Sequence, residues 1–128
     1  MSRPIQILAA LLTLSVAPAF AEEAGNAAAG ERVFNQCRAC HTINRGGRAM
    51  VGPNLFGIVG RRAGAAEGFR YSPAMREKHE QNFVWTLDNL RAYIRHPKEV
   101  VPRGSMSYPG LRNEEQLNNL LAYLQAQH

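Results

Sequence analysis

Long hydrophobic runs are nearly absent from this sequence. The only one extends from Ile5 to Val16, and it is shorter than the roughly 20 apolar residues that a membrane-spanning helix needs. It follows Arg3 and precedes Ala19-Phe20-Ala21, a small-x-small pattern. A positive start, a short apolar core and such a pattern are typical of a secretory signal peptide. We therefore expect residues 1–21 to be cleaved off, export to the periplasm, and no stable membrane insertion.

A strong excess of charge of one sign is also missing. Loss of Arg3 with the signal peptide would lower the formal net charge from +5 to +4. A net charge of this size is much lower than that of a nucleic-acid-binding domain, in which basic residues cluster along one element. It suits a surface that attracts an acidic protein partner. Residues 22–128 contain no linker or repeat, so we expect one small domain.

Cysteine is scarce, and this limits the chemistry of the two that are present, Cys37 and Cys40. A closed zinc site would need further Cys or His ligands at matched spacing, and there is no third cysteine. A thioredoxin-like redox pair needs a βαβ setting, which the sequence does not indicate. His41 follows Cys40 directly, and Cys-x-x-Cys-His is the pattern of a covalent c-type haem site.

The order of these residues suits the attachment chemistry. Each thiol can add to one vinyl group on the same edge of a porphyrin, and the adjacent imidazole is then carried to the iron. The sequence therefore predicts one haem c attached through Cys37 and Cys40, with His41 as an axial ligand. A domain of this size buries only about two thirds of its unfolded surface, so an enclosed macrocycle would supply much of the missing interior.

Alternation of apolar and polar residues, the mark of half-buried strands, is not sustained anywhere in the chain. Helices are predicted after four capping residues: from Asn26 to about Cys37, from Ser72 to Glu80, from Thr86 to before Pro97, and from Asn113 nearly to the C-terminus. The last has an apolar stripe of Leu117, Leu120, Leu121 and Leu124. Gly30, inside the first, suggests a close backbone approach. The predicted class is all-α with long connections.

The candidates for the second axial ligand are Met50, Met75, Met106, His79, His96 and His128, with an open position as the alternative. Met106 is favoured because prolines and glycines bound its segment, from Pro102 to Gly110, which can lie as an irregular loop over the ring. Met50 follows His41 too closely, and Met75 falls in a predicted helix. His79 and His96 are expected to be solvated, and the terminal His128 to be mobile.

From residue 25 to the C-terminus the sequence resembles the class I c-type cytochromes. The motifs occur in the family's order: Gly30-x-x-Val33-Phe34, Cys37-x-x-Cys40-His41, Gly52-Pro53-Asn54-Leu55, Gly60-Arg61, Gly68-Phe69-x-Tyr71, Trp85, Tyr93, Pro97 and Pro102 to Met106. The resemblance implies a small single-haem fold of three to five helices with long loops wrapped around the haem. The segment before Met106 departs from the family's Pro-Gly-Thr-Lys-Met, because Arg103 and Ser105 intrude.

The resemblance also implies roles for individual residues. His41 and Met106 would be the axial ligands, and the carbonyl of Pro53 would accept a hydrogen bond from the other imidazole nitrogen. The remaining haem contacts that it implies are Arg61, Tyr71 and Trp85 at a buried propionate, and Tyr93 at the methionine sulfur.

The function that follows from this resemblance is one-electron transfer in the periplasm by a monomeric carrier that is not an enzyme. Its partners would be respiratory or photosynthetic redox proteins with acidic docking surfaces. They would meet a haem edge framed by Arg45, Arg48 and Lys98, with Arg38 and Arg103 as further candidates. Two alternatives remain open: an electron-transfer subunit of a periplasmic dehydrogenase or oxidase, and a haem peroxidase or gas sensor with a vacant iron position.

Overall fold

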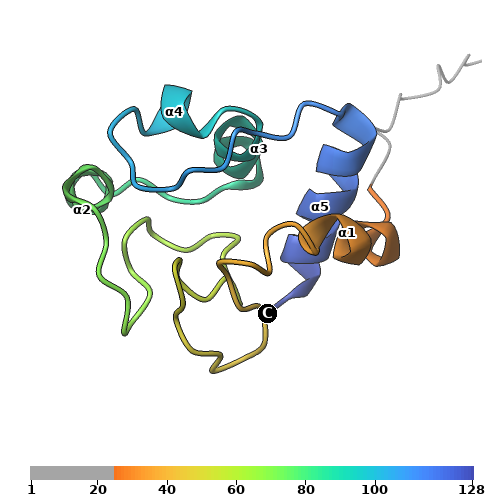
Figure 1. Ribbon diagram of the computed structural model, residues 1–128, viewed down its shortest axis with the longest axis horizontal. Coiled ribbons are helices and arrows are strands. Elements are labelled where there is room, and N and C mark those ends of the chain that lie inside the picture. The colour runs from red at the N-terminus through yellow and green to blue at the C-terminus, as the bar shows by residue number, and fades with distance from the viewer. Residues whose placement is uncertain (1–24) are drawn as a thin grey trace, which may run out of the picture.

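The computed structural model describes residues 25–128, so the expected signal peptide lies outside the described residues. The helices in this part of the chain are α1 (Ala27–Phe34), α2 (Pro73–Glu80), α3 (Leu87–Arg95), α4 (Pro97–Val100) and α5 (Glu114–Ala126). Among these residues, the β pairing is limited to an isolated antiparallel bridge between Arg62 and Val84. The predicted all-α class with long connections is confirmed (Figure 1).

Side-chain caps set where four of the helices begin. Asn26, Ser72, Thr86 and Asn113 each accept a hydrogen bond from a backbone N–H in the first turn of the helix that follows. Each bond satisfies one of the N–H groups that have no partner within the helix. All four starts agree with the sequence prediction. The end of α1 does not, because residues 35–40 continue as turns after Phe34.

The short helix α4 was not expected from the sequence. Proline disfavours helical geometry in the residue before it, and His96, with φ −146° and ψ 79°, ends α3. The fixed φ of the same proline suits the first position of a new helix, so α4 begins at Pro97. One residue thus ends one helix and starts another.

The terminal helices α1 and α5 cross at Gly30 (Figure 1). A Cβ atom at this position would lie 1.9 Å from the carbonyl oxygen of Asn119 and 2.8 Å from the Cβ atom of Tyr123, so only glycine allows the approach. The rings of Phe34 and Tyr123 pack next to the crossing, with centroids 5.4 Å apart. The predicted close approach is confirmed, as is the stripe, whose members are all buried: Leu117, Leu120, Leu121 and Leu124.

Polar contacts fix the remaining elements around this crossing. Glu114, in the first turn of α5, forms ion pairs with Arg91 and Arg95 of α3. His79 is half-buried and its Nδ1 lies 2.8 Å from the carbonyl oxygen of Ala63. The expectation that His79 is solvated is therefore wrong, because this side chain ties α2 to the preceding loop. Within residues 25–128, no helix has the length and hydrophobicity that a membrane crossing requires.

Candidate functional site

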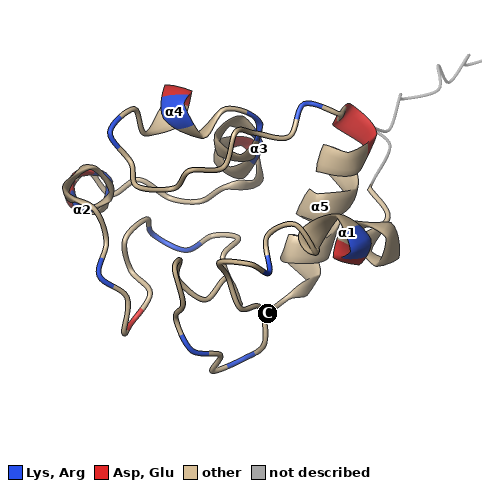
Figure 2. Ribbon diagram, in the orientation of Figure 1, with Lys and Arg blue, Asp and Glu red and all other residues tan. Residues whose placement is uncertain are grey.

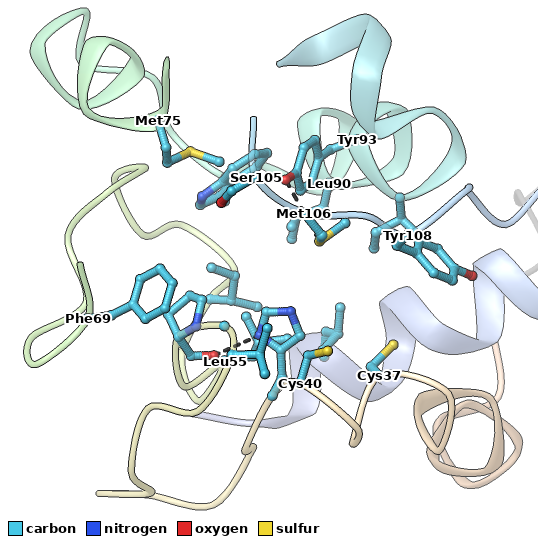
Figure 3. Close-up of a pocket in the computed structure, with 18 of the residues that line it drawn as sticks. Cys37, Cys40, Leu55, Phe69, Met75, Leu90, Tyr93, Ser105, Met106 and Tyr108 are labelled. Carbon is cyan, nitrogen blue, oxygen red and sulfur yellow. Dashed lines mark hydrogen bonds between the residues drawn. The ribbon is translucent and has the colours of Figure 1, made fainter. Parts of the chain in front are cut away.

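A cavity of about 330 Å³ lies between the helices and the long loops. Its lining is mainly apolar, with side chains from distant parts of the chain that include Phe34, Leu55, Ile58, Trp85, Leu90 and Leu120. Cys37, Cys40, His41 and Met106 also line it. Figure 3 shows Cys37 and Cys40 on one side of the cavity and Met106 on the other. The structure therefore brings together the residues that the sequence proposes for attachment and ligation.

Two short backbone contacts hold the His41 segment against the Pro53 segment. The N–H of Gly52 donates to the carbonyl of Cys40 over 2.8 Å, and the N–H of Leu55 donates to the carbonyl of Thr42 over 2.9 Å. Between these two bonds, the Nδ1 atom of His41 lies 2.8 Å from the carbonyl oxygen of Pro53. A carbonyl can only accept, so Nδ1 carries the proton and Nε2 has a free lone pair. That lone pair is what a metal ion needs.

The side chain of Asn54 stabilises this arrangement. Its amide donates to the hydroxyl of Thr42 over 2.8 Å and to the carbonyl of Asn44 over 2.9 Å, and its oxygen accepts from the N–H of Phe56 over 3.0 Å. With these bonds, the loop after Pro53 is fixed to both ends of the segment that follows His41. The position of the Pro53 carbonyl is therefore set by a network and not by one contact.

Burial keeps His41 in the form that ligates. Desolvation lowers the pKa of its imidazole; the hydrogen bond to Pro53 acts in the opposite direction, and the nearby Arg61 lowers the pKa further. The neutral form is therefore favoured at physiological pH. Burial, with a smaller contribution from Cys40, raises the pKa of the Cys37 thiol to about 11, so neither a Cys37 thiolate nor a charged imidazole is favoured in this mainly apolar cavity.

Met106 reaches the cavity from the segment between α4 and α5. The hydroxyl of Tyr93, on α3, lies 3.8 Å from the Met106 sulfur and is placed to donate a hydrogen bond to it (Figure 3). Burial raises the pKa of this hydroxyl to about 12, so it keeps its proton. The Tyr93 ring packs on Trp85, with centroids 4.8 Å apart, which fixes the direction of the hydroxyl.

The cavity is also lined by Arg61, Tyr71 and Trp85, all of which lie in loops. The Arg61 guanidinium donates to the carbonyls of Asn54 and Phe56, over 2.9 and 3.3 Å. The Tyr71 hydroxyl accepts from the N–H of Ala66 over 3.1 Å and keeps its own proton available to donate. Arg61 and Tyr71 supply a positive charge and a hydrogen-bond donor in a mainly apolar lining.

The other two methionine candidates differ in their positions. Met50 is 50% exposed, and Met75 is in α2, where it packs against the core and lines the cavity. Sequence reasoning assigned no role to Tyr108, which also lines the cavity. Its place two residues after Met106, in the same proline- and glycine-bounded segment, was the signal that could have drawn attention to it.

Most of the basic residues expected at the haem edge already have partners within the described chain. Arg38 pairs with Glu31 at 3.8 Å, Arg103 pairs with Glu77 at 3.1 Å, and the Lys98 amino group donates to the carbonyl of Gly104. The guanidinium of Arg45 lies 4.9 Å from the centroid of the Phe56 ring. Arg48 is exposed, and its side chain forms no ion pair or hydrogen bond among residues 25–128.

The Cytochrome c family profile matches residues 27–127 of this chain. The chain belongs to the cytochrome c family. Cytochrome c2 of Blastochloris viridis is 42% identical over 114 residues, which cover 89% of this chain and 85% of that protein. Cytochrome c-550 of Nitrobacter winogradskyi is 40% identical over 100 residues, which cover 78% and 89% respectively. Among solved structures, cytochrome cH from Methylobacterium extorquens matches with a TM-score of 0.71 and 35% identity, covering 79% of this chain and 98% of that one.

Membership in the cytochrome c family makes this protein a small electron carrier that binds haem c through Cys37 and Cys40. The residues of the cavity fit this group. The two thiols lie at Cys-x-x-Cys spacing on one wall, the lining is apolar, and an imidazole nitrogen and a thioether sulfur are both present. Arg61 and Tyr71 add a positive charge and a hydroxyl to the lining, and such groups could contact the acidic substituents of a haem.

Proposed function

We propose that this cytochrome c is a periplasmic one-electron carrier, a monomer without enzymatic activity, whose His41 and Met106 are the axial ligands. The bound haem supplies an iron that alternates between ferric and ferrous. The protein holds both ligands in place during this change and keeps water away from the ring. A methionine and histidine pair, together with burial, raises the reduction potential, which suits the oxidising side of a respiratory or photosynthetic chain.

One observation carries this proposal: His41 and Met106 line the same cavity, and each is held by its own partner. The imidazole is oriented by the Pro53 carbonyl at 2.8 Å, and the sulfur lies 3.8 Å from the Tyr93 hydroxyl. Neither partner competes for the atom that would bind iron, since the sulfur has two lone pairs and Nε2 is unprotonated. The periplasmic location is supported by the signal-peptide pattern of residues 1–21.

Replacement of Met106 tests the ligation. In the Met106→Ala variant, the charge-transfer absorption from sulfur to ferric iron should disappear and the midpoint potential should fall. Met50→Ala and Met75→Ala serve as matched controls, because each removes a thioether at another position, and both should retain the band and the potential. Loss of the band in Met75→Ala would mean that the wrong methionine has been assigned.

The partner in this proposal is a redox protein with an acidic docking surface. Figure 2 shows arginines and lysines on the long loops between α1 and α2 and on α4, which contains Lys98. Among Arg38, Arg45, Arg48, Lys98 and Arg103, only Arg45 and Arg48 share their charge with no acidic side chain or backbone carbonyl in the described chain. Arg45 packs over the Phe56 ring, whereas Arg48 is exposed and has no such contact. Positive charge at the rim would speed the approach of an acidic partner and make the rate dependent on salt.

Two small oxidants of opposite charge can test the sign of this surface. Oxidation by ferricyanide should slow as salt rises, because the Debye length falls from about 10 Å at 0.1 M to about 3 Å at 1 M; oxidation by tris(phenanthroline)cobalt(III) should accelerate. Arg48→Gln should flatten the ferricyanide dependence more than Arg112→Gln, which changes the net charge equally but lies beside the start of α5. If the two variants change the salt dependence equally, the argument for docking near Arg48 is removed.

A further inference from the structure

The segment from Ser105 to Gly110 carries Met106 across the cavity with little support from its own backbone. Among residues 25–128, none of its backbone groups takes part in a backbone–backbone hydrogen bond. The nearest such bonds lie outside it: the N–H of Gly104 donates to Val101 over 3.0 Å, and the N–H of Leu111 donates to Ile94 over 2.9 Å. Between these two backbone hydrogen bonds, the position of Met106 therefore depends on contacts made by side chains.

Two side chains of this segment form hydrogen bonds within the described chain. One is the Met106 sulfur, 3.8 Å from the Tyr93 hydroxyl, a long contact made by the thioether itself. The other is the Tyr108 hydroxyl, which donates to the side-chain oxygen of Gln36 over 2.8 Å. At this distance the second bond has the usual length of an O–H···O hydrogen bond.

The backbone of Gln36 is held in the turns that end α1, and its side chain is exposed next to Tyr108. The N–H of Gln36 donates to the carbonyl of Val33 over 3.4 Å, and the next N–H, of Cys37, donates to Phe34 over 2.7 Å. Gln36 and Cys37 therefore belong to the wall of the cavity that carries the haem attachment. The bond from Tyr108 crosses from the wall that carries Met106 to this opposite wall.

The ring and the hydroxyl of Tyr108 have separable contacts. The ring is half-buried against the hydrophobic core and lines the cavity. Figure 3 shows Tyr108 beside Met106 on the side toward Cys37, with its hydroxyl pointing away from the other cavity side chains. Substitution by phenylalanine would keep the packing and remove only the bond to Gln36.

We propose that Tyr108 is a positioning residue whose hydrogen bond to Gln36 holds the segment 105–110 closed over the cavity and thereby keeps Met106 in place. The inference rests on the proposed ligation by Met106. It goes beyond that ligation, because it assigns the retention of the ligand to a pair of residues that are not proposed iron ligands and form no hydrogen bond with the Met106 sulfur.

The rate at which Met106 leaves can be measured on the ferric holoprotein with imidazole as the probe. If the methionine must leave before imidazole can bind, the observed rate reaches a plateau at high imidazole, and the plateau equals the opening rate. Tyr108→Phe should raise this plateau about two- to tenfold, the range that the loss of one neutral hydrogen bond supports. The charge-transfer band in the absence of imidazole should remain.

A double-mutant cycle shows whether the effect belongs to this pair. Gln36→Leu should raise the plateau as much as Tyr108→Phe, and the double variant should raise it no further. Gln36→Glu keeps an accepting oxygen and should keep the plateau at or below the wild-type value. Tyr123→Phe, which removes a hydroxyl from a buried tyrosine of α5 outside the cavity lining, should leave it unchanged.

The outcomes separate the two proposals. If the wild-type protein shows the charge-transfer band and a plateau, and Tyr108→Phe leaves that plateau unchanged, the role of Tyr108 is overturned. The ligation by Met106 would then remain intact. Additive effects of Tyr108→Phe and Gln36→Leu would also overturn it. A wild-type protein without the band, which binds imidazole at a rate that never saturates, would overturn the ligation and the role of Tyr108 together.

Discussion

Gly52 lies against the His41 ring, and this contact leaves no room for a side chain at position 52. A Cβ atom there would be 2.4 Å from Cε1 and 2.7 Å from Nδ1 of the imidazole, well inside van der Waals contact. The ring cannot move away without breaking its hydrogen bond to Pro53. The glycine of the Gly52-Pro53 motif therefore serves a defined purpose, which is to leave room for the ligand.

Gly52→Ala should consequently displace the imidazole. We expect the free energy of unfolding of the holoprotein to fall by about 1–3 kcal/mol, as in other overpacked sites, and a high-spin ferric signal to appear in electron paramagnetic resonance. Met50→Ala is the control, because this nearby side chain is 50% exposed and does not line the cavity, so its truncation should change neither quantity. A Gly52→Ala protein with wild-type stability and a purely low-spin spectrum would contradict the account of this contact.

At the scale of elements, the crossing of α1 and α5 depends on Gly30 in the same way. Two effects of Gly30→Ala oppose each other. Alanine favours a helix interior by about 1 kcal/mol over glycine, whereas its Cβ would collide with the Asn119 carbonyl, for which the distance is 1.9 Å. The backbone cannot yield as a flexible side chain would, so the collision should dominate.

We therefore expect Gly30→Ala to lower the free energy of unfolding by about 1–3 kcal/mol, measured by guanidinium chloride denaturation of the holoprotein. Ala28→Gly, at an exposed position of the same helix, measures the propensity effect alone and should cost about 1 kcal/mol. An increase in stability in Gly30→Ala would show that the two helices are not in the close contact described.

The elements that the sequence predicts are those with local causes. The caps Asn26, Ser72, Thr86 and Asn113 each bond to an N–H three residues ahead, so the residues needed to recognise them are adjacent in the chain. The short helix α4 was missed because Pro97 was used only to place the end of α3. The same proline also suits the first position of a new helix. His79 was misjudged because its partner, Ala63, is 16 residues away in sequence.

The same distinction applies to the site. The pair Cys37 and Cys40 with His41 is a local pattern and could be predicted, and Met106 could be favoured because of the prolines and glycines around it. The bond between Tyr108 and Gln36 joins residues 72 positions apart. No periodicity or spacing indicates such a pairing, since it arises only when the loops fold around the cavity.

At the scale of the whole molecule, the protein is built around its cavity. Buried side chains from α1, α3, α5 and the loops face the same space, among them Phe34, Leu90, Leu120 and Trp85. One wall supplies the attachment and the imidazole, and the other supplies the thioether. If both axial positions are filled in this way, iron has no vacant site for a substrate, which suits outer-sphere electron transfer and not catalysis.

Binding of carbon monoxide to the ferrous holoprotein at neutral pH tests this central claim most directly. Carbon monoxide needs a vacant iron position, so the wild-type protein should bind it slowly and incompletely, while Met106→Ala, with the position opened, should bind it rapidly and in a 1:1 ratio. Rapid stoichiometric binding by the wild-type protein under native conditions would contradict the closed-site account and favour a haem enzyme or gas sensor.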